Sequence, residues 1–165
     1  MDLNYGALAE WLRRGLQNLL CQFNSGRRLH KFLVTYMKSV VVCGSKKFKT
    51  DIAQFCKSLN KLGVLVFEPS IQKPILESEL IQSSYVTSKV FKGLTLEQFD
   101  WIRKSEVCFI YNKNDYVGVS VTLEMAYASA LGKPIFALSA KTGDPCRDCL
   151  IDKVVKTPLS LTALL

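Results

Sequence analysis

The stretch EVCFIYNKNDYVGVSVTLEMAYASALGKPIFAL, residues 106–138, decides the fold. It contains a short apolar run, a polar loop, an alanine-rich segment, a Gly-Lys-Pro stop and a second apolar run. Short apolar runs rich in β-branched residues are typical of strands buried on both faces, and Gly followed by Pro commonly ends a helix. The stretch therefore predicts a strand over 106–111, a helix over 120–131 and a strand over 135–138.

The same alternation continues toward the amino terminus. The β-branched run SVVVC precedes a segment with apolar residues at helical spacing, which ends at a glycine before another short apolar run. Strands that alternate with helices form right-handed βαβ units, so we expect a three-layer α/β domain with a parallel sheet. The further expected elements are a strand over 39–43, a helix over 50–62 closed by Gly63, a strand over 64–67, helical segments with a loop over 70–93, and a helix that begins at Thr95 as its N-cap.

Ligands of parallel α/β sheets bind beyond the carboxyl ends of the strands. At that edge the sequence carries neither a GxGxxG nor a Walker A motif. Gly44 and Ser45 allow the backbone to approach a ligand, and Lys46, Lys47 and Lys49 follow them. Because the helix dipole disfavours cations at a helix N-terminus, these lysines indicate either a nearby anion such as a phosphate or a solvated cluster that serves solubility.

Glu124 is the carboxylate that stands out in the alanine-rich helix. With Ser120 as N-cap, it falls at the start of the helix and shares a face with Tyr127 and Leu131, so it points toward the core or a cleft. Two interpretations stay open. Glu124 is either a partner of the helix dipole or a nucleophile that the helix terminus keeps ionised.

Cysteine usage indicates the compartment. Of six cysteines, Cys43 and Cys108 lie inside apolar strand-like runs and have the character of reduced core thiols, which favours the cytoplasm. Cys146 and Cys149 have CxxC spacing without a second pair, which is a weak basis for a zinc or redox site. We expect no metal and no cofactor.

Charge and hydropathy exclude other classes of protein. The net charge is +8, but the basic residues are scattered and no aromatic-interleaved basic stripe or nucleic-acid motif is present. No apolar run approaches the roughly 18 residues that span a bilayer, and no signal peptide is recognisable. We therefore expect neither nucleic acid nor a membrane as a partner.

Residues 1–36 differ in character from the rest. Residues 6–30 form a basic amphipathic helical pattern, but the string also resembles the conceptual translation of a transfer-RNA gene, with Phe23-Asn24-Ser25 matching the T-loop. We expect translation to begin at Met37, so that 37–165 is the single α/β domain. A genomic sequence without a cloverleaf upstream of that codon would contradict this. Without residues 1–36 the chain loses its only histidine, which excludes catalytic triads that contain histidine.

Three motifs in order, VVVCGSKKF, WIRKSEVCFIYN and GVSVTLEMAYASALGKPI, resemble the nucleoside 2-deoxyribosyltransferase superfamily. That superfamily includes the 2′-deoxynucleoside 5′-monophosphate N-glycosidases, whose first strand similarly ends in CGS. The resemblance covers most of residues 38–140. It implies a flavodoxin-like Rossmann fold and a homo-oligomer, usually dimeric at base, with sites near subunit contacts. It also implies that Glu124 attacks the anomeric carbon to form a glycosyl-enzyme, which water or a second base resolves.

The resemblance also implies roles for residues near that glutamate. Gly118 and Ser120 would hold the 5′ end of the sugar, Asn112 would close the strand below them, and Tyr116 would stack on a base or cap the loop.

The second carboxylate of the family is less clear in this chain. Gly118 stands where the family often has an aspartate or serine. Eight residues before Glu106, where the family commonly has an acid or histidine, the chain has Gln98, with Asp100 two residues away. Asp100 and Asp115 are both candidates for the second catalytic carboxylate, and Gln98 is a candidate for substrate binding.

We therefore expect an enzyme that cleaves or transfers across the N-glycosidic bond of a nucleoside or nucleoside 5′-monophosphate. The lysines after Ser45 favour a phosphorylated substrate. The alternative is a nucleotide-sensing module that uses the same cleft without turnover, because fold does not fix function.

Overall fold

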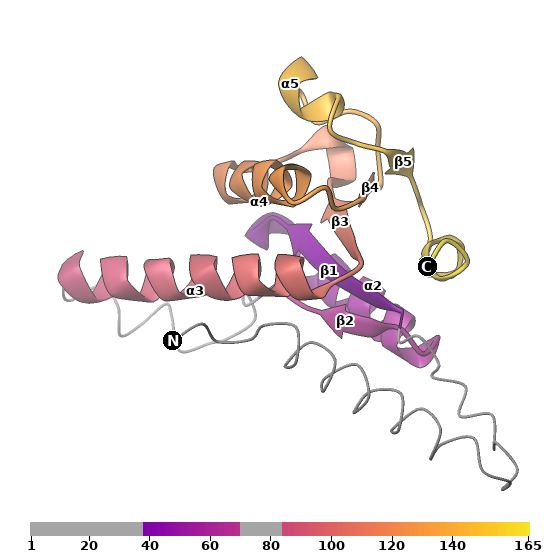
Figure 1. Cartoon of the computed structure of the whole chain (residues 1–165), viewed down its shortest axis with the longest axis horizontal. Helices are drawn as coiled ribbons and strands as arrows, with labels where there is room; N and C mark the ends of the chain where they lie inside the picture. Colours follow the sequence, from indigo (N-terminus) through magenta and orange to yellow (C-terminus); the bar gives the residue numbers. More distant parts are fainter. Residues whose placement is uncertain (1–37, 70–83) are drawn as a thin grey trace, which may run out of the picture. The chain divides into compact units, whose positions relative to one another are not determined.

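The computed structural model describes residues 38–69 and 84–165 (Figure 1). The predicted N-terminal segment 1–36, and the part of the segment predicted over 70–93 that covers residues 70–83, lie outside the described residues. The strands are β1 (Ser39–Gly44), β2 (Leu65–Phe67), β3 (Val107–Tyr111), β4 (Ile135–Ala137) and β5 (Lys153–Val154). The helices are α2 (Lys49–Lys61), α3 (Ser84–Lys104), α4 (Val119–Ala130), α5 (Pro145–Asp148) and α6 (Pro158–Thr162), with short 3-10 turns η1 (Lys46–Phe48) and η5 (Lys113–Asp115).

The five strands form one sheet in the order β2-β1-β3-β4-β5, and every neighbouring pair is parallel. This is the flavodoxin-like strand order of doubly wound α/β folds. The longest pairing joins Val40–Gly44 to Val107–Tyr111, so β1 and β3 form the centre of the sheet. The predicted α/β class with a parallel sheet is confirmed.

Alternation along β1 builds two cores, one on each face of the sheet. Val40 and Val42 lie in a buried cluster with residues of α2 and α6, such as Ile52. Val41 and Cys43 lie in a second cluster with residues of α3 and α4, and these two helices run over the same face (Figure 1). Because successive side chains of a strand point to opposite faces, one β-branched run supplies both cores. The three layers are therefore helix, sheet and helix.

The start of α3 differs from the prediction. The helix begins at Ser84, so Thr95 is an interior residue and not an N-cap. Its hydroxyl donates to the carbonyl of Phe91, 2.9 Å away, one helical turn earlier. A threonine inside a helix can make this bond, so its presence did not mark a helix start.

The start of α4 also differs. Its N-cap is Gly118, in an extended conformation (φ −84°, ψ 169°), and not Ser120. The carbonyl of Gly118 accepts the first helical bond, from the amide of Thr122 at 3.0 Å. Glu124 is consequently the sixth residue of the helix, beyond its first turn, and the helix dipole acts on it less than the sequence predicted.

The predicted glycine stop of α2 is present. Gly63 has a φ of +79°, which glycine adopts without the steric cost of a side chain.

Within the described ranges, no helix is both long and apolar enough to cross a membrane.

Candidate active site

The strand order places the switch point of the sheet between β1 and β3. Gly44 and Tyr111 are paired at the carboxyl ends of these strands, and the loops that follow meet there. The Nζ atom of Lys47 lies 3.9 Å from the centroid of the Tyr116 ring, and the Phe48 ring lies 6.2 Å from it edge-on. The two loops are thus joined by a cation–π and an aromatic contact.

Gly44 and Ser45 shape the first loop. A Cβ atom at Gly44 would lie 2.5 Å from the Cδ1 atom of buried Ile52, so a side chain at this strand end would require the Ile52 side chain to shift. The hydroxyl of Ser45 accepts a hydrogen bond from the amide of Lys47 at 3.3 Å and caps η1. The Lys46 side chain is exposed. Gly44, Ser45 and Lys46 therefore do lie at the edge where the sequence predicted them.

Asn112 clamps the loops after β3 and β4 together. Its side chain is fully buried, and its amide donates to the carbonyls of Ser139 (2.9 Å) and Lys141 (2.7 Å). Its oxygen accepts from the amide of Ser139 at 3.0 Å. These bonds use both amide hydrogens of Asn112, so the structure gives it a positioning role at the edge.

Asp115 and Tyr116 lie on the exposed side of this clamp. A carboxylate oxygen of Asp115 accepts from the hydroxyl of Ser139 at 2.5 Å. Asn114 and Asp115 both have a φ of +57°, which is uncommon for residues with a side chain and is seen most often at turns and functional loops. The loop thus holds Asp115 in one place.

Glu124 faces inward from α4. The residue as a whole is half-buried, but its Oε2 atom is inaccessible to solvent and accepts no hydrogen bond from any residue that the structure describes. Burial raises the pKa of this carboxyl to about 7, and the nearby thiol of Cys43 opposes that shift. A buried carboxylate without a cation beside it is costly to ionise, and such groups gather at functional sites.

Polar groups from three elements lie at Cys43, near Glu124. The Sγ atom of Cys43 lies 3.6 Å from that of Cys108, across β1 and β3. From α3, the Nε2 atom of Gln98 lies 3.3 Å from the same sulfur and 3.5 Å from the carbonyl oxygen of Val42. Gln98 therefore contacts the end of β1 from α3, and its role in substrate binding stays a prediction.

Asp100 lies elsewhere. It is two residues from Gln98 on α3, about 200° around the helix, so it points away from the buried side. Its carboxylate pairs with Lys104 at 2.5 Å and Arg103 at 3.1 Å on the solvent face. Hydrogen bonds from Lys104 and then Arg103 lower the pKa of Asp100. The structure does not bring Asp100 together with Glu124.

Gly118 and Ser120 lie at the beginning of α4. The Ser120 side chain is exposed, and a Cβ atom at Gly118 would make ordinary contact with the Tyr116 hydroxyl at 3.6 Å. Gly118 is thus not required by packing, which leaves close approach of a ligand as a reason for a glycine there.

One anchor of α4 was not predicted. Arg147 of α5 donates to the hydroxyl of Thr122 at 3.1 Å and to the carbonyl of Thr142 at 2.9 Å. Thr122 lies two residues before Glu124 on α4. The sequence carries no signal for this contact, because the three residues become neighbours only in the fold.

The CxxC pair is exposed, and both thiols are free. The Sγ atom of Cys149 donates to the carbonyl of Cys146 at 3.2 Å. In the part of the chain that the structure describes, no group of three or more His, Cys, Asp and Glu side chains could hold a metal ion.

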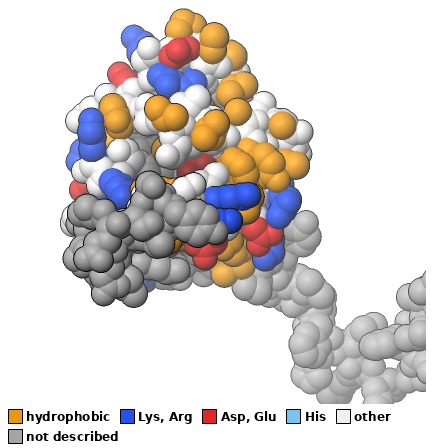
Figure 2. Space-filling model, turned by 90° about the vertical axis from the view of Figure 1, so that its left-hand side faces the viewer, with side chains coloured by type: hydrophobic (Ala, Val, Ile, Leu, Met, Phe, Trp, Pro, Cys, Tyr) orange, Lys and Arg blue, Asp and Glu red, His pale blue; other side chains and the backbone are white. Residues whose placement is uncertain are grey.

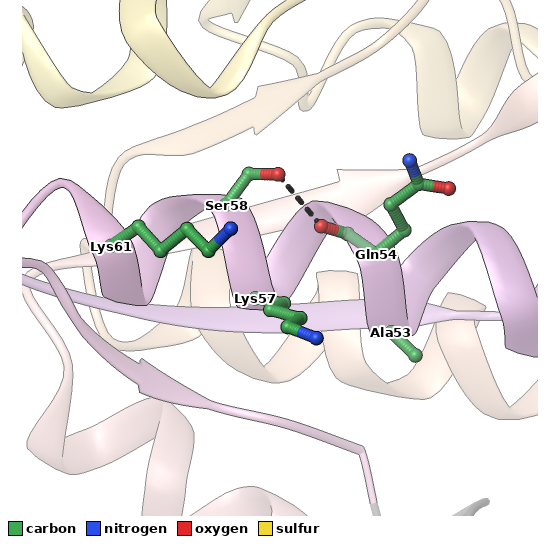
Figure 3. Close-up of a pocket in the computed structure, with 5 residues that line it drawn as sticks. All are labelled: Ala53, Gln54, Lys57, Ser58 and Lys61. Atoms are coloured by element: carbon green, nitrogen blue, oxygen red, sulfur yellow. Dashed lines mark hydrogen bonds between the residues drawn. The ribbon is translucent and has the colours of Figure 1, made fainter.

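A surface pocket of about 420 Å³ lies on the outer face of α2 (Figure 3). Its lining residues are Ala53, Gln54, Lys57, Ser58 and Lys61. All five come from one helix, the Ser58 hydroxyl is bonded to the Gln54 carbonyl at 2.9 Å, and the pocket contains none of the predicted site residues. The pocket therefore does not compete with the carboxyl edge as the candidate site.

No protein-family model matches the sequence, and no curated protein sequence matches it. Among solved structures, the chain is similar to the 2-deoxyribosyltransferase of the psychrotolerant bacterium Bacillus psychrosaccharolyticus, with 17% identity and a TM-score of 0.53 over 75% of this chain and 90% of that one. A conserved protein from Enterococcus faecalis V583 matches with 13% identity and a TM-score of 0.49 over 77% of this chain and 96% of that one. The 2-deoxyribosyltransferase-like fold that the sequence motifs implied is confirmed.

Proposed function

We propose that this protein cleaves or transfers across the N-glycosidic bond of a nucleoside or nucleoside 5′-monophosphate, with Glu124 as nucleophile. The observation that carries the proposal is the buried Oε2 atom of Glu124, near the switch point of the sheet, which has no hydrogen-bond partner within residues 38–69 and 84–165. The likeness in fold to a 2-deoxyribosyltransferase supports the same reaction class.

The chemistry fits such a carboxylate. Cleavage of an N-glycosidic bond passes through an oxocarbenium-like state, which an adjacent carboxylate stabilises and then captures as a glycosyl ester. The C–N electron pair leaves with the base, which takes up a proton. Water or a second base then attacks the anomeric carbon and releases Glu124. Since the pKa of Glu124 is about 7, a large fraction is ionised at neutral pH.

Asp115 is the better supported candidate for the second carboxylate. It belongs to a loop at the carboxyl edge and is held there by Ser139, whereas Asp100 is paired with two cations on the outer face of α3. Exposed Lys46 at the same edge supports a phosphorylated substrate.

The test is chromatography of the full chain incubated with nucleosides and 5′-monophosphates, each alone and with a free acceptor base. We expect release of free base, or an exchanged nucleoside, with at least one of them. A folded chain that binds a nucleotide in calorimetry but yields neither product with any of them would overturn the proposal and favour the sensing module.

A homo-oligomer is part of the proposal. The exposed face of α4 bears no charged side chain: Val119 is 81% exposed, Leu123 is 53% exposed, and Ala126 and Ala130 continue the same side. An apolar helix face of this kind is normally covered, and its small residues allow a second copy of α4 to approach closely.

Leu123→Asp tests that contact. We expect the full chain to sediment as a dimer at micromolar concentration and the variant as a monomer, because a charge in an apolar interface has no partner. Leu159→Asp is the matched control, since Leu159 is 68% exposed on α6. A monomeric wild type, or equal effects of the two variants, would contradict the assignment of α4 as the contact between the two copies.

We further propose a cytoplasmic protein that does not bind nucleic acid. The five cysteines in the described part of the chain are free, which suits a reducing compartment. On the coloured part of the face in Figure 2, Lys and Arg side chains are scattered among hydrophobic and neutral ones. Such a distribution does not favour tracking of a phosphate backbone.

A further inference from the structure

Arg147 joins the first half of α4 to the loop between β4 and α5. Its Nη1 atom donates to the hydroxyl of Thr122 at 3.1 Å, and its Nη2 atom donates to the carbonyl of Thr142 at 2.9 Å. Its Nε atom donates to the hydroxyl of Thr142 at 3.3 Å, and Thr142 is buried. All three nitrogen atoms of the guanidinium therefore take part in the connection.

On the side of α4, the contact reaches the start of the helix. The Thr122 hydroxyl donates its own proton to the carbonyl of Gly118 at 3.1 Å, so it acts as an acceptor toward Arg147. The same carbonyl accepts from the amide of Thr122 at 3.0 Å. Arg147 is thus connected, through one hydroxyl, to the N-cap residue of the helix that carries Glu124.

On the side of the loop, the contact reaches a segment that is fixed by other bonds. Lys141 precedes Thr142, and its carbonyl accepts from the buried amide of Asn112 at 2.7 Å. One carboxylate oxygen of Asp148 accepts from the amide and from the hydroxyl of Thr142, each at 2.6 Å. This loop is therefore held to the end of β3 and to α5 by bonds that do not involve Arg147.

The shape of the guanidinium explains why an arginine makes this connection. A guanidinium presents five N–H donors in a rigid planar fork, whereas a lysine ammonium is a point charge on a flexible stem. Within residues 38–69 and 84–165, Arg147 forms no ion pair, and its hydrogen bonds go to neutral oxygens. What Arg147 contributes is the geometry of the fork, which sets the spacing between α4 and the loop.

We propose that Arg147 is a positioning residue of the candidate active site, which holds the start of α4 at a fixed place relative to the loop after β4. This inference rests on the proposed function, in which Glu124 attacks the substrate. The loop also carries Ser139, the partner of Asp115, so a shift of α4 changes the distance between the two proposed catalytic carboxylates. A displacement of about 1 Å can cost about 10²-fold in rate. Arg147 itself does not touch substrate.

The test compares the steady-state kinetics of full-chain variants, with a nucleoside or 5′-monophosphate from the chromatographic panel that releases base. We expect Arg147→Lys to lower kcat by about 10-fold and to change KM by less than about 3-fold, because one ammonium does not hold both acceptors at the spacing of the fork. Thr122→Val keeps the branched shape without the hydroxyl and should lower kcat to a similar extent. Thr122→Ser restores the hydroxyl and should recover most of that loss.

Lys133→Ala is the matched control. The Nζ atom of Lys133 donates to the carbonyl of Ser105 at 2.6 Å, so it also holds an end of α4 to a distant segment, but at the opposite edge of the sheet, where β3 and β4 begin. We expect this variant to lower the urea midpoint of unfolding and to keep kcat within about 2-fold of the wild type. Equal losses of kcat in Lys133→Ala and Arg147→Lys, or a Thr122→Val variant with the wild-type rate, would overturn the proposal.

A second readout does not depend on turnover. The amide hydrogen of Thr122, which is bonded to the carbonyl of Gly118, should exchange with solvent about 5-fold faster in Arg147→Lys than in the wild type, and at the wild-type rate in Lys133→Ala. An exchange rate that Arg147→Lys leaves unchanged would overturn the proposal. A chain without turnover that shows the faster exchange would remove the proposed function and leave the anchoring of α4 by Arg147 standing.

Discussion

Glu124→Gln is expected to lower the rate of base release by more than about 10³-fold while it changes nucleotide affinity by less than about 3-fold. Glutamine keeps the size and the planar end of the side chain but carries no charge to capture the anomeric carbon. The measurement is release of free base under substrate saturation, followed by chromatography, with binding measured separately by calorimetry.

Two other carboxylates serve as matched controls for that loss. Asp100→Asn should keep activity within about 2-fold, since Asp100 is an exposed residue already paired with Arg103 and Lys104. Asp115→Asn should reduce the rate of base release, because Asp115 is the proposed second catalytic carboxylate. A Glu124→Gln variant that retains more than a tenth of the rate would remove Glu124 as nucleophile.

The central elements of the fold could be predicted from local pattern. In Val40–Cys43 every second residue faces the same side, and all four residues belong to one of the two cores. Because this run is apolar throughout, it specifies a strand buried on both faces. The start of α4 was harder to predict, because Gly118 and Ser120 are both acceptable N-caps. The cap is Gly118, and only the three-dimensional path of the loop decides this.

The candidate site could be predicted in part, for a different reason. That Glu124 faces inward follows from helical spacing on one element. The environment of Glu124 does not follow from the sequence. The nearby Cys43 thiol comes from a strand about eighty residues earlier in the chain, and the sequence identifies it only as an apolar core residue. Helical phase alone separates Gln98 from Asp100, which lie about 200° apart on α3. This separation could be deduced from the sequence alone if the buried side of α3 were known.

The same Glu124→Gln substitution is expected to stabilise the fold at pH 8, by up to about 3 kcal/mol. The folded pKa of Glu124 is raised from 4.5 to about 7, so between these values the folded state binds a proton that the unfolded state has lost. The free energy of unfolding of the wild type therefore falls as pH rises from about 4.5 to about 7 and stays lower above that. Glutamine does not ionise and escapes this loss.

Urea unfolding at pH 4 and pH 8 measures the effect. The two proteins should have similar free energies of unfolding at pH 4, where the carboxyl is protonated in both states, and they should separate at pH 8. Asp100→Asn gives the opposite sign, because its folded pKa is lowered: it should cost stability at neutral pH, and that cost should vanish as pH falls through the acid range. If Glu124 served only the helix dipole, its removal would destabilise the protein at pH 8 as well. A gain in stability together with a loss of turnover is the combination expected of a charge that the fold holds at a cost for use in catalysis.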